Sequence, residues 1–391
     1  MPEDDISSQD VRSVVVKSLT VQMKSYTPRA VAYLNVGLKE ALGDLTEPRE
    51  LSNLFLTVQH MVAKASASIF VGLDLCENKE LVEAFKYITT DVGQSIRMDS
   101  VFFERFSTLN RLRMWYTGKY APRIRKRKLQ MIEAMKPEID RRMRGIAGKE
   151  PSWTRPADIL QEIIENYAPP ASSDTNIYTY FTHWMIALTF AAIHTTSEHA
   201  TVVLYRLLQQ PEIIDELLQE QKEVFGDDHT NSNVFTGDAI KKLVKLDSVC
   251  REALRAKNVF LDLPHSNTGG QSITLSNGVV IPSGHDVLLN QWMNHHDNEL
   301  QKDTAGNYDN FEPFRYVDMH CPSTKIGDGY LTFGEGKHAC PGRWFALQEI
   351  KTIVSVLIRD YTLKANGPIE FPTGTKSGIP TGKVSIQRKM M

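Results

Sequence analysis

The chain has 391 residues, of which 41% are hydrophobic and 24% charged, and its formal net charge is −2. This length and composition can bury a large apolar core, and the near-neutral charge provides no global field that would favour nucleic acid as a partner. Because no linker, repeat or low-complexity stretch divides the chain, we predict a single, mainly α-helical domain with a minor β-sheet over residues 1–391.

The N-terminus and the cysteines indicate in which kind of cellular compartment the chain is expected. The first six residues, MPEDDI, are acidic and lack an apolar stretch, so we expect neither a signal peptide nor a membrane anchor in this chain. The cysteines show no paired spacing, which is typical of a reducing compartment. They are Cys76, Cys250, Cys321 and Cys340.

A basic run, RIRKRK, occupies residues 123–128 and follows Trp115 and Tyr120. Runs of like charge are usually solvated, so we interpret this one as the exposed face of a helix or loop.

Residues 184–208 form an apolar run that predicts a long core helix. Polar residues at its centre argue against a membrane span, and small residues at 191 and 192 would let it pass close to a planar partner. The hydroxyl of Thr195 can hydrogen-bond back to the helix. His194 precedes it and has an ordinary pKa of ~6.5, so it could relay protons or could be an ordinary core histidine.

Two segments follow that predict local structure. Glu252 and Arg255 stand three residues apart on a predicted helix, where a bidentate charge pair can form. Residues 272–282 place Asn277-Gly278 between β-branched residues, a pattern that predicts a hairpin with a type I′ turn.

The most informative segment is FGEGKHACPGRWFA, residues 333–346, in which Cys340 lies in a glycine-rich loop before a predicted helix. The positive end of a helix stabilises a thiolate, and a single sulfur ligand suits an axial position on haem iron. One alternative is a structural cysteine in a turn. Another is a zinc site that combines His320-Cys321 with His338 and Cys340, although these spacings fit no common finger pattern.

The spacing Phe333-x-x-Gly336-x-x-x-Cys340-x-Gly342 resembles the haem-thiolate loop of the cytochrome P450 family. The residues of the loop are similar to those of fungal microsomal members in particular. The resemblance implies the cytochrome P450 fold with Cys340 as the axial thiolate of the haem iron. It also implies that Phe333, Gly336 and Gly342 shape the haem loop.

The same resemblance assigns further roles. His338, and His265 in Leu263-Pro264-His265, match positions that contact haem propionates. Glu252 and Arg255 match the Glu-x-x-Arg pair of the family, with Arg315 as its third, structural member. Thr195 matches the threonine of the oxygen-activating helix, with His194 in place of the usual acid and Ala192 in place of the usual glycine.

The resemblance begins near residue 27 and covers only the later part of the family pattern. We therefore expect an N-terminally shortened member, which is either a gene model without its first exons or a shorter protein with a less enclosed haem pocket. Both explanations stay open.

The function that the resemblance implies is monooxygenation of a lipophilic small molecule, such as a terpenoid or another fungal secondary metabolite. Haem would be the cofactor, O2 the co-substrate and NADPH–cytochrome P450 reductase the electron donor. A full-length form would face the cytosol from the endoplasmic reticulum, with the region around residues 123–128 near the membrane. Alternatives are isomerisation or dehydration without a reductase, and an impaired or truncated remnant that binds haem poorly.

Overall fold

The structure is a computed structural model that describes residues 6–96, 106–169, 175–226, 232–257, 262–301, 307–373 and 378–389. Helices dominate the described residues, and their strands form small antiparallel sheets. The predicted mainly α architecture with a minor β component is therefore confirmed. No helix among the described residues is both long and apolar enough to cross a membrane.

The described residues group into two compact units. Unit one takes its residues from 6–46, 55–198 and 232–240, and unit two takes its residues from 47–54, 199–226 and 241–389. Helix α10 (Ile177–Gln209) begins in unit one and ends in unit two, which confirms the long helix predicted over 184–208.

Unit one is helical throughout its described residues apart from the connections. Besides the first part of α10, its elements are α1 (Ser8–Val14), η1 (Val15–Leu19), α2 (Met23–Leu42), α3 (Leu54–Phe70), α4 (Leu73–Cys76), α5 (Lys79–Ile96), α7 (Ser107–Tyr120), α8 (Pro122–Ile146), α9 (Ile159–Asn166), η3 (Ser232–Val234) and α12 (Gly237–Lys241). Helix α8 buries Met131, Met135 and Ile139, which are spaced four residues apart on one face. Arg123 and Arg125 of the basic run are exposed.

A buried ion pair ties three segments of unit one together. Arg142 of α8 donates to both carboxylate oxygens of Asp158, at 2.6 and 2.8 Å, and also to the carbonyl of Val71 at 3.1 Å. Asp158 in turn caps α9 by accepting from the backbone N–H of Gln161 at 2.9 Å. Each buried charge therefore has a hydrogen-bonded partner, which buried ions require.

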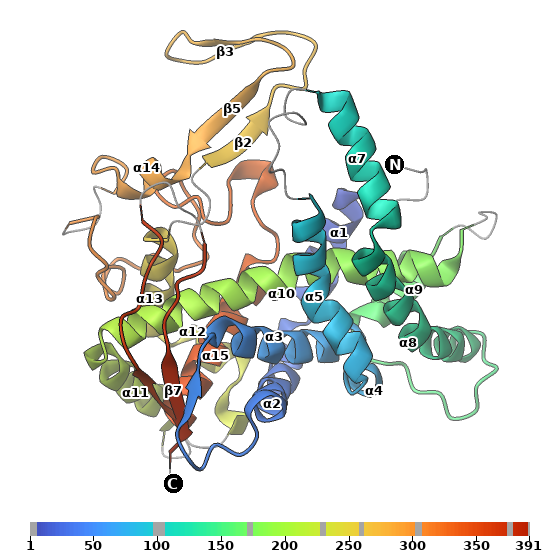
Figure 1. The fold of residues 1–391 in the computed structure, drawn as a ribbon, viewed down its shortest axis with the longest axis horizontal. Coiled ribbons are helices and arrows are strands. Elements are labelled where there is room, and N and C mark those ends of the chain that lie inside the picture. The colour runs from blue at the N-terminus through green and yellow to red at the C-terminus, as the bar shows by residue number, and fades with distance from the viewer. Residues whose placement is uncertain are drawn as a thin grey trace. The chain divides into compact units, whose positions relative to one another are not determined.

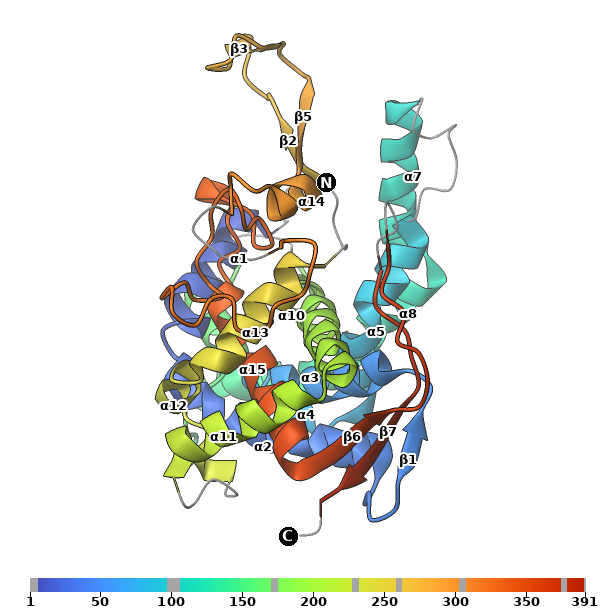
Figure 2. The same cartoon turned by 90° about the vertical axis from the view of Figure 1, so that its left-hand side faces the viewer.

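Unit two combines helices with all the strands that the structure describes. Besides the end of α10, its elements are β1 (Arg49–Leu51), α11 (Glu212–Phe225), α13 (Val244–Arg255), β2 (Asp262–Ser266), β3 (Ile273–Thr274), β4 (Val280–Ile281), β5 (Asp286–Asn290), α14 (Gln291–His296), η4 (Gly336–His338), α15 (Arg343–Asp360), β6 (Tyr361–Ala365) and β7 (Val384–Arg388). The first and last strands lie side by side in the order β1-β7-β6 (Figure 2). The core helix α15 is buried along nearly its whole length.

The predicted hairpin is present, but its predicted turn type is wrong. Strands β3 and β4 pair at the far end of the β2–β5 ladder (Figure 1). Gly278 has a positive φ of 84°, whereas Asn277 does not, and a type I′ turn needs positive φ at both positions. The N–H of Gly278 donates to the carbonyl of Leu275 at 2.9 Å, so the glycine ends a longer loop instead of forming a two-residue turn.

Candidate functional site

The loop from Phe333 to Gly342 is closed by its own backbone. The N–H of Cys340 donates to the carbonyl of Phe333 at 2.7 Å, which brings the two ends of the loop together. Gly334 and Gly336 make the return possible because their φ angles are +67° and +57°, a region that side chains with a Cβ disfavour. Phe333 is buried beneath the loop, whereas Gly336 is exposed at its tip.

Cys340 is half-buried and lies directly before α15, whose N-cap is Gly342. The N–H groups of a helix N-terminus favour negative charge, so this position supports a thiolate. Cys76 and Cys250 are buried instead, and burial raises the pKa of both thiols. Cys340 and Cys321 are therefore the two cysteines whose exposure suits metal ligation.

Arg343 forms a hydrogen bond with the backbone carbonyl of Cys340, a contact that we did not predict. Its guanidinium donates to the Cys340 carbonyl at 2.8 Å and to the Thr324 carbonyl at 3.0 Å, and it stacks 3.5 Å above the Trp344 ring. A cation at the first position of a helix opposes the helix dipole. That unfavourable placement was a signal in the sequence that Arg343 has a specific partner.

Two imidazoles lie near the loop. His338 of η4 and His265 of β2 are exposed, and their ring centroids are 6.4 Å apart. His265 sits in the β2–β5 ladder opposite Val287, so its backbone position is set by the sheet. A third imidazole, His199, stacks on Phe333 with centroids 6.5 Å apart.

These residues fit a haem group in their chemistry. The loop offers one accessible sulfur, two hydrogen-bonding imidazoles suited to carboxylates, and an apolar ring in Phe333. A Cβ on Gly336 would meet nothing within 4 Å, so the loop tip leaves open space where a flat group could approach. A zinc cage does not fit as well, because no cluster of three or more His, Cys, Asp or Glu ligands occurs among the described residues.

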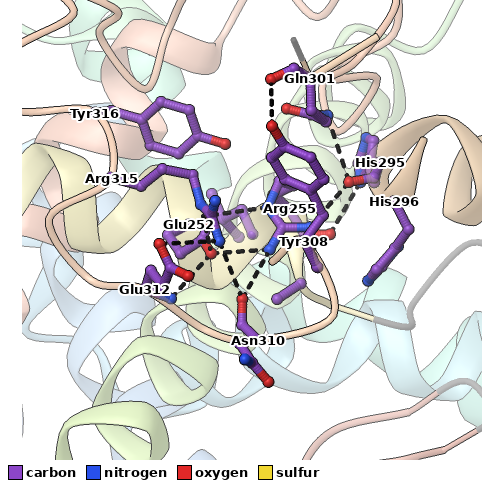
Figure 3. Close-up of polar contacts among 12 residues, drawn as sticks. Glu252, Arg255, His295, His296, Gln301, Tyr308, Asn310, Glu312, Arg315 and Tyr316 are labelled. Carbon is purple, nitrogen blue, oxygen red and sulfur yellow. Dashed lines mark hydrogen bonds and ion pairs between the residues drawn. The ribbon is translucent and has the colours of Figure 1, made fainter. Parts of the chain in front are cut away.

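Glu252 and Arg255 form a fully buried pair on α13 (Figure 3). Arg255 donates to both oxygens of Glu252, at 2.7 and 2.8 Å. Burial disfavours the charge of Arg255, but the hydrogen bonds to Glu252 outweigh that penalty and raise its pKa. The pair is thus held by two charge-assisted hydrogen bonds.

Arg315 joins the same carboxylate. Its Nε donates to Glu252 Oε1 at 3.2 Å, and the backbone N–H of Glu312 donates to that oxygen at 3.0 Å. The two arginines also donate to four backbone carbonyls of the surrounding segments. Figure 3 labels three of these acceptors, His295, Tyr308 and Asn310, and the fourth is the carbonyl of Asn307. Three of these carbonyls belong to the coil that precedes the cysteine loop, so Arg255 and Arg315 satisfy part of its backbone.

His295 connects this cluster to the cysteine loop and was not predicted. Its Nε2 accepts from the N–H of Leu331 at 2.7 Å, so its proton is on Nδ1 and is donated to the Arg255 carbonyl at 3.0 Å. Burial lowers its pKa to about 3, which keeps the ring neutral. His295 thereby links the end of α13 to the residue that lies two before Phe333.

Glu349 of α15 is a second residue that we did not predict. It is buried, burial raises its pKa to about 8, and neither carboxyl oxygen has a hydrogen-bond partner within the described part of the chain. The sequence contained a signal for this burial. Position 349 follows Phe345 by one helical turn, so the helical period places this acid on the apolar face of the helix.

The oxygen-activation candidates lie on the unit-one part of α10. The hydroxyl of Thr195 donates to the Ala191 carbonyl of its own helix at 2.6 Å. His194 is half-buried, contacts the Phe55 ring edge-on at 5.3 Å, and lies 3.9 Å from the carboxylate of Glu198. Glu198 is buried and was not predicted, although its spacing of four from His194 was visible in the sequence.

Comparison with known proteins identifies the family. The family model described as Cytochrome P450 matches residues 6–389. Among curated proteins, Cytochrome P450 monooxygenase 151 of Postia placenta is 28% identical over 79% of this chain and 60% of its own length. Cytochrome P450 monooxygenase 103 of the same fungus is 28% identical over 91% of this chain and 69% of its own length.

A third relative, Cytochrome P450 monooxygenase olcJ of Penicillium canescens, is 28% identical over 93% of this chain and 65% of its own length. The chain therefore spans about 60% to 69% of the length of these relatives. With its helical fold and the match over residues 6–389, the chain belongs to the cytochrome P450 family, whose members bind haem.

Proposed function

We propose that this chain carries the haem-thiolate core of a monooxygenase. The observation that carries the proposal is Cys340, which is half-buried at the start of α15 in a closed loop with an open glycine tip. When bound, haem supplies the activation of O2, so that one oxygen atom enters the substrate and the other leaves as water. The two electrons come from NADPH through a separate reductase.

The residues around Cys340 hold the sulfur in place. Cys340 would supply the sulfur ligand of the haem iron, and its backbone is fixed on one side by Phe333 and on the other by Arg343. Phe333, Gly336 and Gly342 shape the loop, the last as the N-cap of α15. A ligand fixed in this way requires little reorganisation when it binds the metal.

His338 and His265 hold the carboxylate side of the cofactor. Both are exposed imidazoles and can donate hydrogen bonds to propionates, which would anchor the group by charge-assisted contacts. Glu252, Arg255 and Arg315 have a structural role, because they organise the coil that leads into the loop.

Thr195 and His194 manage protons. A hydroxyl accepts as well as donates hydrogen bonds, so Thr195 can accept a hydrogen bond from a proton donor while it donates its own hydrogen to the Ala191 carbonyl. His194 can accept and donate protons, and the Glu198 carboxylate lies 3.9 Å from its Nε2. Thr195 and His194 would together pass protons at the position where the family resemblance places an acid followed by a threonine.

The substrate class rests on the relatives. Those named above are fungal cytochrome P450 monooxygenases. We propose a lipophilic fungal secondary metabolite, such as a terpenoid, as the substrate. We also propose NADPH–cytochrome P450 reductase as the electron donor and the cytosolic face of the endoplasmic reticulum as the location of the whole protein.

The test is the difference spectrum of the reduced, carbon-monoxide-bound protein. Wild type and Cys321→Ala should both show the red-shifted band of thiolate-ligated haem, and Cys340→Ala should lack it. Cys321 is the matched control because it is the other half-buried cysteine of the described chain. Absence of haem from the wild type would instead support an impaired remnant, and turnover without NADPH and reductase would support isomerisation or dehydration.

A further inference from the structure

Strands β2 and β5 form a two-stranded ladder, and within the described residues neither strand has another strand beside it. The two strands run antiparallel, with Leu288 of β5 opposite Pro264 of β2. The ladder extends away from α13 and α15 (Figure 1), and β5 exposes 61% of Leu288 and 37% of Leu289. Each strand therefore has an outer edge at which a further strand can add.

Pro264 blocks the outer edge of β2. The N–H of Asn267 donates to the His285 carbonyl at 2.9 Å, which marks this pair as a hydrogen-bonded one. Because hydrogen-bonded and non-hydrogen-bonded pairs alternate along an antiparallel ladder, Pro264 and Leu288 form a non-hydrogen-bonded pair. The backbone nitrogen of Pro264 thus faces outwards, and proline has no hydrogen there to donate to an added strand.

The outer edge of β5 has no such block. By the same alternation, the backbone N–H and carbonyl groups of Asp286, Leu288 and Asn290 point away from β2, towards the open edge. The strand contains no proline and no lysine, which natural proteins often place on edge strands to prevent pairing. Its single charge, Asp286, lies at the end of the strand and accepts from the hydroxyl of Ser266 at 2.6 Å.

We propose that β5 pairs with β5 of a second copy of this chain, antiparallel and about a twofold axis at Leu288. The register centred on Leu288 is the one antiparallel register in which all three outward-pointing residues of each strand form hydrogen-bonded pairs. It places Leu288 opposite Leu288 of the second copy and Asp286 opposite Asn290 of the second copy. The two carboxylates are thereby kept apart, and each faces an amide that can donate to it.

This pairing would turn two marginal two-stranded ladders into one four-stranded sheet, in the order β2-β5-β5-β2. The contact comprises one short strand from each copy, so it is smaller than the ~1,600 Å² of a standard interface. We therefore expect a weak dimer that forms at high protein concentration. The proposal concerns association alone and does not depend on the proposed monooxygenase activity.

The test is sedimentation velocity of the haem-loaded chain over a series of increasing concentrations, which should show an equilibrium between monomer and dimer. Leu288→Lys should weaken the dimer at least tenfold, because it places two ammonium groups opposite each other at the axis. Val280→Lys is the matched control, since Val280 is 55% exposed on β4 and lies outside the edge, and it should leave the dimer unchanged. A wild type that is monomeric at every concentration would overturn the proposal, as would an equal effect of the two variants.

A second pair of variants tests the register. Asn290 caps α14 by accepting from the N–H of Met293 at 2.8 Å, and aspartate caps helices equally well. Asn290→Asp should nevertheless weaken the dimer at least threefold at low salt, because the new carboxylate faces Asp286 of the second copy. Adding Asp286→Asn to this variant should restore the wild-type affinity. An unchanged dimer in Asn290→Asp, or no recovery in the double variant, would overturn the proposed pairing.

Discussion

The carboxylate of Glu252 is fully buried and is shared by two arginines of unit two. Removing it would take from the buried guanidinium of Arg255 the carboxylate that it pairs with, and Arg315 would lose the nearer of the carboxylates of Glu252 and Glu312. Uncompensated buried charge is one of the few single-residue changes with a large energetic effect. The cluster also supports the coil before Cys340, so its loss should destabilise the cysteine loop as well.

We predict that Glu252→Gln lowers the free energy of unfolding by about 3–5 kcal/mol. Urea denaturation followed by circular dichroism measures the change. Glu312→Gln is the control, because its side chain is 40% exposed and its pairing with Arg315 should contribute ~0–1 kcal/mol. A loss below ~1 kcal/mol for Glu252→Gln would contradict a stabilising role for the cluster.

Glu349 shows how burial alone sets a protonation state. Because burial raises its pKa to about 8 from the ordinary value of 4.5, the folded protein retains a proton that the unfolded chain loses. The contribution of this carboxyl to stability is complete below pH 4.5 and is lost as the pH rises from 4.5 to 8.

The wild type therefore loses stability relative to Glu349→Gln as the pH rises. We expect the free energy of unfolding of the variant minus that of the wild type to increase by about 1.4 kcal/mol per pH unit. Urea titrations at several values between pH 5 and 8 measure the difference. Glu335→Gln, at an exposed position of the cysteine loop, should show a constant difference over the same range. An equally constant difference for Glu349→Gln would mean that the carboxyl is ionised in the folded protein.

At the scale of elements, α13 organises the coil that leads to the cysteine. Asp247 accepts from the backbone N–H and the hydroxyl of Ser323, both at 2.7 Å. Arg251 donates to the Pro322 carbonyl at 3.0 Å and the Lys325 carbonyl at 2.6 Å. One helix thus supplies the polar partners that a long segment with little secondary structure needs.

The contact between α2 and α3 in unit one depends on a glycine. A Cβ on Gly37 would lie 2.9 Å from the Cα of Met61 and 3.2 Å from the His60 carbonyl oxygen. Both neighbours are backbone atoms of α3, so they cannot move aside as a side chain could. The absence of a side chain at this position lets the two helices approach closely.

We predict that Gly37→Ala destabilises the protein by about 1–3 kcal/mol, although alanine is the better helix former. Gly93→Ala on α5 is the matched control, because a Cβ there meets nothing within 4 Å, and it should stabilise by up to ~1 kcal/mol. Thermal and urea unfolding of the two variants give the comparison. The same sign for both variants would argue against the close helix contact.

At the scale of the whole molecule, the proposed cofactor couples to stability. A ligand that binds only the folded state stabilises it by about 2.7 kcal/mol at 100 times its dissociation constant. We predict that haem removal lowers the melting temperature of the wild type and of Cys321→Ala, and that Cys340→Ala shows a much smaller change. An equal change in all three proteins would mean that haem binds elsewhere than at Cys340.

Much of this fold was predictable from local patterns. The helix after Gly342, the long helix around Thr195 and the hairpin at 272–282 each depend on residues close in sequence. The turn type at Asn277-Gly278 was wrong because a hydrogen bond from Gly278 to Leu275 favoured a longer loop. Local propensity chooses between turn types by small energies, which one backbone contact can reverse.

The sequence by itself determined the family, the helical class, and the loop in which Cys340 stands, because spacing and periodicity are properties of neighbouring residues. Only the tertiary structure decided the roles of His295 and Glu349. His295 binds groups 40 and 36 residues away, and the pKa of Glu349 depends on how many atoms exclude water from it. Long-range contacts and burial arise when distant segments pack, and no local pattern specifies them.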